Sequence, residues 1–115
     1  MPHTLTNTIC ADTIARARTR HNVPWCADFE RMVSGNIYDA MVPELVNARA
    51  AARVWMHNYN NTNADRGDPA VEDKRVDMLR ECLGKVGDGA FIEPIFSFDY
   101  GCNITLGLDF YANFG

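Results

Sequence analysis

The chain has 115 residues, enough for one modest domain with its own core. Its 47% apolar and 23% charged residues are ordinary for a globular protein and argue against a disordered chain. The net charge of −4, without a basic stripe, argues against nucleic acid as a partner. No apolar run reaches the length of a membrane span or a signal-peptide core, so we expect a cytoplasmic protein without a membrane partner.

The four cysteines are widely scattered and lack the spacing of zinc ligands. We therefore expect reduced thiols and no bound metal. The N-terminal segment, residues 1–26, is polar and mixed in composition. Although DTIARARTR within it has the composition of a short helix, we expect the segment to behave as a tail.

Helical spacing of apolar residues begins at Phe29, Met32 and Val33, and Gly35 suits a C-cap. These residues predict a short helix at 27–34. A second helix is predicted at 43–60, because Pro43 suits a first helical turn and one apolar stripe follows it, formed by Leu45, Ala48, Ala52, Trp55 and Tyr59.

A third helix is predicted after the polar loop NNTNADRGD, with Asp68 as its cap, Pro69 in its first turn and Gly87 at its end. Its apolar residues are Val71, Val76, Leu79, Cys82 and Leu83. Two long amphipathic helices joined by a loop favour an antiparallel pair.

Helical periodicity stops near Asp88, where we expect a domain boundary. Beyond it apolar residues recur every six positions, at Ile92, Phe98, Ile104 and Phe110. A period of six is typical of a hexapeptide-repeat β-helix, in which three short strands form one coil of about eighteen residues. Gly101 and Gly107 share one place in the repeat and relieve crowding at a corner. An ordinary β-meander with alternating aromatic residues is the alternative.

Two segments resemble the maltose and galactoside O-acetyltransferases, a family of hexapeptide-repeat sugar acetyltransferases. FERMVSGNIYDAMVPELVNARAAARVWMHNYN resembles the family's helical cap, and FIEPIFSFDYGCNITLGLDFYANF resembles its entry into the β-helix. The intervening DKRVDMLRECLGKVG fits the family's third helix. The resemblance covers residues 28–115. It implies an α+β chain with a helical cap at 27–87 and, at 88–115, the first, incomplete coils of a left-handed parallel β-helix that assembles as a homotrimer.

The resemblance also implies acetyl transfer from acetyl-CoA to a hydroxyl of a sugar such as maltose, glucose or a galactoside. Asn113 matches an asparagine beside the reacting hydroxyl, where its amide would donate to a developing oxyanion. Asp99 and Tyr111 match acceptor-binding positions, although a corner turn and coil packing are the structural alternatives. Asp39 lies in the cap loop that faces the acceptor, but in some relatives the acidic contact aligns with Ala40.

Attack of a sugar hydroxyl on a thioester needs a general base, usually histidine. The family's catalytic histidine lies beyond residue 115, and the three histidines present, in a tail, a loop and a solvated helix face, are poor substitutes: His3, His21 and His57. The chain stops four residues into a repeat. We therefore expect the N-terminal part of a sugar O-acetyltransferase, inactive alone and lacking most of the acetyl-CoA site. The alternative is a non-catalytic cap remnant that binds a sugar or a partner subunit.

Overall fold

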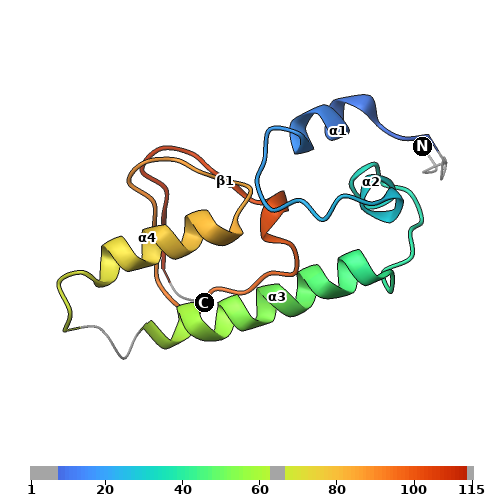
Figure 1. Cartoon of the computed structure of the whole chain (residues 1–115). Helices are drawn as coiled ribbons and strands as arrows, with labels where there is room; N and C mark the ends of the chain where they lie inside the picture. Colours follow the sequence, from blue (N-terminus) through green and yellow to red (C-terminus); the bar gives the residue numbers. More distant parts are fainter. Residues whose placement is uncertain (1–7, 63–66, 114–115) are drawn as a thin grey trace.

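The computed structural model describes residues 8–62 and 67–113. Within this part of the chain the helices come first: α1 (Ala11–Ala17), α2 (Ala27–Val33), α3 (Pro43–Asn60) and α4 (Val71–Cys82). Short strands and a 3-10 turn follow: β1 (Lys85–Val86), β2 (Phe91–Ile92), η2 (Gly101–Asn103), β3 (Thr105–Leu106) and β4 (Tyr111–Ala112). Figure 1 shows α1 and α2 near the N-terminal end of α3, with α4 beside its C-terminal half.

The helices predicted at 27–34 and 43–60 are confirmed as α2 and α3. The Cys26 side chain caps α2 by accepting the backbone N–H of Phe29 at 3.3 Å. Gly35 ends α2 with a φ of +78°, a conformation that glycine adopts at little cost. Pro43 opens α3, where its missing N–H costs no intrahelical bond.

The N-terminal segment is not the loose tail that its composition suggested. Helix α1 packs against α2 and buries Ile14 and Ala17. Farther on, the backbone N–H of His21 donates to the carbonyl of Gly84 at 2.8 Å, which ties the segment to the C-terminal part of the chain. The expectation of a tail is therefore wrong for residues 8–26, because two apolar side chains on one helix face are enough to join a core.

Helix α4 begins at Val71 and ends at Cys82, five residues before the predicted end at Gly87. The cause is a tertiary contact: the N–H of Gly84 donates to the carbonyls of Gly101 (2.9 Å) and Ile104 (3.1 Å). The chain thus leaves the helix to join the repeat region. Strand β1 consequently lies within the range predicted for the helical cap.

The repeat region is built from parallel strand pairs between successive coils. β1 pairs with β3 in the register Lys85↔Thr105, and β2 pairs with β4 in the register Phe91↔Tyr111. Parallel pairing is the arrangement of a β-helix and excludes the β-meander alternative. The six-residue spacing is confirmed within each coil, from β1 to β2 and from β3 to β4. The register gives twenty residues for the described coil, two more than expected.

Side chains of α3 take the place of a strand on the third side of the coil, where no strand occurs in the described residues. The Tyr59 hydroxyl donates to the carbonyl of Ile92 at 2.6 Å. The Asn60 amide accepts the N–H of Phe96 at 2.9 Å and donates to its carbonyl at 3.2 Å. These contacts satisfy backbone groups that would otherwise lie unpaired near the core.

The main core forms where α3, α4 and the coil meet. The rings of Trp55 and Tyr59 stack with their centroids 4.6 Å apart. Phe96 and Phe98 from the coil pack around Trp55, at 6.1 and 5.3 Å. The Trp55 indole donates to the carbonyl of Met78 in α4 at 2.7 Å, so one side chain links all three parts. A second core cluster joins α1, α2, the start of α3 and the turn η2 through Ala17, Phe29, Leu45 and Cys102.

We predict that Tyr59→Phe lowers the free energy of unfolding by about 1–3 kcal/mol, because it leaves the buried carbonyl of Ile92 without a donor. Urea denaturation followed by circular dichroism measures the change. Tyr38→Phe is the matched control, since the exposed Tyr38 hydroxyl makes no hydrogen bond within the described residues. Equal stability of the two variants would contradict the role assigned to Tyr59.

We further predict that Gly101→Ala destabilises the chain by about 1–3 kcal/mol, whereas Gly107→Ala does not. The two glycines share one place in the six-residue period of the sequence, but Gly101 lies in the turn η2 and Gly107 follows β3. A Cβ at Gly101 would lie 2.5 Å from the carbonyl oxygen of Cys82, but a Cβ at Gly107 would meet nothing within 4 Å. Thermal unfolding of both variants tests the difference, and similar melting temperatures would contradict the close approach of Gly101 to the end of α4.

Candidate functional site

Tyr111 and Asn113 lie together at the end of β4. The Tyr111 ring stacks on Phe91, its register partner in β2, with centroids 5.1 Å apart and planes 8° from parallel. Its hydroxyl donates to Asn113 Oδ1 at 2.5 Å. Because the amide oxygen is engaged, the Asn113 Nδ2–H groups, which have no partner within the described residues, are available to a ligand oxygen. The coil thereby presents an oriented amide donor.

Asn113 borders a pocket of about 640 Å³ beside the last strand of the coil, here called the Asn113 pocket. The other lining residues are mostly apolar: Ile92, Ile95, Phe96, Ser97, Ile104, Leu106, Phe110 and Ala112. A hydrogen bond from Asn113 at the edge of an apolar surface is stronger than one made in bulk water. This position suits a group that stabilises charge on a bound oxygen.

Asp99 lies on the side of the coil that faces α3. Its Oδ1 pairs with Arg53 Nη2 at 3.4 Å, and about 60% of each side chain is exposed. An exposed pair of this length contributes little to stability. The carboxylate therefore keeps capacity to accept hydrogen bonds from hydroxyl groups.

Asp39 has a local structural role in the turn before α3. Its Oδ1 accepts the N–H of Met41 at 2.8 Å, and its own N–H donates to Asp28 Oδ1 at 2.9 Å. The hydrogen bond from the Asp39 N–H is the main cause of the lowered pKa of the Asp28 carboxyl. No contact joins Asp39 to Asp99, Tyr111 or Asn113 within the described residues, so the structure brings together only Tyr111 and Asn113 among the four predicted site residues.

Arg49 connects the cap loop to the coil, a role that the sequence analysis did not assign. Its guanidinium donates to the Tyr100 hydroxyl at 2.6 Å and lies 3.9 Å from the Met41 sulfur. It therefore links the loop of Asp39 to the segment of Asp99. The sequence feature that could have indicated this role is the four-residue spacing of Arg49 and Arg53, which places both on one face of α3.

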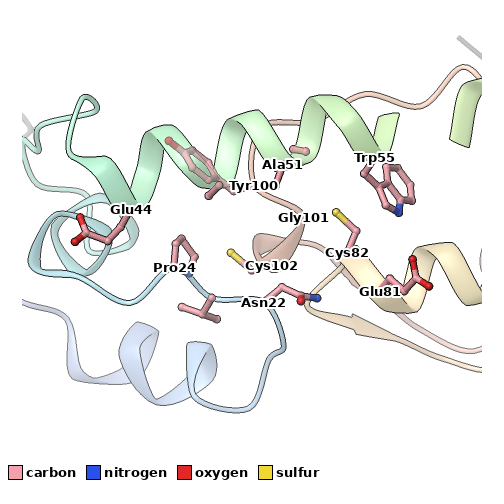
Figure 2. A pocket seen from close by; sticks show the side chains of 13 residues that line it. Asn22, Pro24, Glu44, Ala51, Trp55, Glu81, Cys82, Tyr100, Gly101 and Cys102 are labelled. Carbon is pink, nitrogen blue, oxygen red and sulfur yellow. The ribbon is translucent and has the colours of Figure 1, made fainter. Parts of the chain in front are cut away.

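A second pocket, of about 510 Å³, lies between α3, the segment 22–24 and the turn η2 (Figure 2). None of the four predicted site residues lines it. Cys82 and Cys102 contribute thiols to its wall, and burial raises the pKa of each to about 11. Both thiols are protonated at neutral pH and are therefore poor nucleophiles.

The described histidines are remote from the Asn113 pocket. His57 Nε2 lies 3.2 Å from the Asn61 amide on the exposed surface of α3, and His21 is held through its backbone. Neither lines the Asn113 pocket, and His3 lies outside the described residues. In the same part of the chain, no three His, Cys, Asp or Glu side chains are grouped so that they could hold a metal. No helix described there combines the length and apolarity needed to cross a membrane.

Comparison with known proteins matches residues 31–87 to the maltose acetyltransferase hexapeptide capping motif. Nodulation protein L of Rhizobium meliloti is 42% identical over 85 residues, which cover 74% of this chain and 44% of that protein. Galactoside O-acetyltransferase of Escherichia coli is 33% identical over 85 residues, 74% of this chain and 39% of the relative. Sophorolipid acetyltransferase of Starmerella bombicola is 31% identical over 97 residues, 81% of this chain and 38% of the relative.

The chain thus spans about two fifths of the length of these curated relatives. The segment matched by the capping motif includes α3, α4 and the loop that carries Asp39, and two of these three relatives are named as acetyltransferases. The resemblance seen in the sequence is confirmed: the chain belongs to the acetyltransferase family that includes galactoside O-acetyltransferase and carries the maltose acetyltransferase hexapeptide capping motif.

Proposed function

We propose that this chain is the N-terminal part of a sugar O-acetyltransferase, which transfers acetyl from acetyl-CoA to a hydroxyl of maltose, glucose, a galactoside or a similar acceptor. The observation that carries the proposal is the Tyr111–Asn113 pair, an oriented amide donor at the edge of the Asn113 pocket. The match to a galactoside O-acetyltransferase supports the class of acceptor.

In the proposed reaction the sugar hydroxyl attacks the thioester carbonyl, and negative charge develops on the carbonyl oxygen. Asn113 Nδ2–H donates to this oxygen or to the reacting hydroxyl, while Tyr111 holds the amide in place. Asp99 accepts hydrogen bonds from other sugar hydroxyls, and Asp39 faces the acceptor from the cap loop. The hydroxyl proton passes to a histidine general base contributed by further coils. When the tetrahedral intermediate collapses, its C–S bond breaks, and the coenzyme A thiolate leaves and takes up that proton.

The proposal extends to the organisation of the whole protein. In this organisation residues 27–87 form the cap, whose last strand β1 already pairs with β3, and residues 88–115 begin a left-handed β-helix. Further coils complete the acetyl-CoA site, and the protein acts as a cytoplasmic homotrimer. Parallel pairing between coils and the six-residue spacing support the β-helix.

The second candidate is a non-catalytic cap that binds a sugar or a partner subunit. It is favoured by the lack of an imidazole in the described part of the Asn113 pocket. An assay of acetyl transfer from acetyl-CoA to maltose, glucose and galactosides separates the two. We expect the 115-residue chain to show no turnover and a version carrying further coils to be active. A longer version that binds sugar without turnover would favour the second candidate.

We predict that Asn113→Ala in the longer, active protein lowers kcat about 10²–10³-fold, with a smaller effect on acceptor binding. The reason is that the amide acts on charge that develops only in the transition state. Steady-state kinetics with varied sugar measures both quantities. Asn47→Ala on the exposed surface of α3 is the control. Unchanged turnover with weaker sugar binding would show that Asn113 only binds the acceptor.

A further inference from the structure

A third pocket, of about 540 Å³, lies where the end of α1 meets the start of α2. It is lined by Arg18, Trp25, Cys26, Ala27 and Glu30 and is here called the Trp25 pocket. Its volume is within the range of small-molecule sites. It shares no residue with the Asn113 pocket and precedes the segment matched by the capping motif.

Trp25 is an exposed aromatic side chain with a fixed orientation. The residue is 45% exposed, and its ring meets the fully buried Phe29 edge-on, with centroids 5.6 Å apart and planes at 76°. Phe29 belongs to the second core cluster, so the support is rigid. Because the residue is partly exposed and its indole N–H makes no hydrogen bond within the described residues, the side chain is available to a ligand.

The charged residues of the Trp25 pocket are also free to bind. Neither Arg18 nor Glu30 makes a side-chain hydrogen bond or ion pair to another described residue, whereas the neighbouring Arg31 pairs with Asp28 at 3.0 Å. Ala27 and Glu30 are three residues apart and therefore lie on one face of α2. The small side chain of Ala27 leaves space between Trp25 and Glu30.

This combination of groups disfavours a ligand that carries charge of only one sign. An anion such as a phosphate would be attracted by Arg18 but repelled by Glu30. A cation would be attracted by Glu30 but repelled by Arg18. A pyranose avoids both penalties, because its hydroxyls accept from Arg18 and donate to Glu30 while its C–H face packs on an indole ring. We infer that the Trp25 pocket is an accessory carbohydrate-binding site. This inference does not depend on acetyl transfer.

The test is an NMR titration of the 115-residue chain with maltose. We expect the Trp25 indole N–H resonance to shift with a dissociation constant of about 1–10 mM, in the range of weak ligands. Trp55 is the internal control, because its indole N–H is already bound to Met78. Absence of a shift at Trp25, or a shift produced by coenzyme A but not by maltose, would overturn the inference.

Variants of Arg18, which is exposed, and of Glu30, which is half-buried, test the same pocket with side chains of similar size. Arg18→Gln and Glu30→Gln should each weaken maltose binding about tenfold or more, since each removes a charge-assisted hydrogen bond. Arg16→Gln, on the same helix but outside the pocket, should bind as the parent chain does. Equal affinity of Arg18→Gln and Arg16→Gln would contradict the proposed contact.

The accessory site and the proposed function can fail separately. Asn113→Ala should leave the maltose-induced shift at Trp25 unchanged, because the two pockets share no residue. Acetyl transfer by a longer protein whose Trp25 resonance does not respond to sugar would overturn the accessory site alone. A response at Trp25 in a longer protein without transferase activity would support the accessory site and count against the proposed function.

Discussion

The described coil depends on the hydrogen bonds between α3 and the segment 92–98. Two sides of the coil are paired with strands, but the third side receives its partners from the side chains of Tyr59, Asn60 and Met56. In a stacked β-helix those backbone groups would be satisfied by a neighbouring strand. The helix thus provides a lateral partner for a coil that would otherwise begin with unpaired groups. This explains how helical residues can cap a repeat structure whose backbone geometry they do not share.

The same helix sets the position of the candidate acceptor residues through another face. The stripe of Leu45, Ala52, Trp55 and Tyr59 is buried, while Arg49 and Arg53 contact Tyr100 and Asp99. Asp99 is therefore positioned by α3, whereas Asn113 is positioned by the strand ladder and by Tyr111. Their relative placement depends on how the coil packs against α3. A change in the aromatic core around Trp55 would therefore alter the positions of both Asp99 and Asn113.

Sequence reasoning succeeded where local chemistry decides the structure. Pro43 and the apolar stripe define α3, and the six-residue spacing gave strands that pair in parallel. Sequence reasoning failed where contacts with residues far away in the sequence determine the local structure. The end of α4 is set by the bond from Gly84 to Gly101, and the coil of twenty residues includes a 3-10 turn that no period reveals. Among the predicted site residues, Asp39 shows what the sequence could not reveal: its carboxylate accepts the backbone N–H of Met41 within its own turn.

Burial falls from the side of the coil that contacts α3 and α4 toward its last strand. Ile92 and Leu106 are buried, but Phe110 and Tyr111 are 38% and 63% exposed. Tyr111 is supported by stacking on Phe91 and by the ladder to β2, both on the same side. Asn113 in turn is held by the hydroxyl of Tyr111. The amide therefore sits at the end of a chain of contacts that begins at α3. Its orientation is only as well fixed as the stacking of Tyr111 on Phe91, so that ring pair is the structural basis of the candidate site.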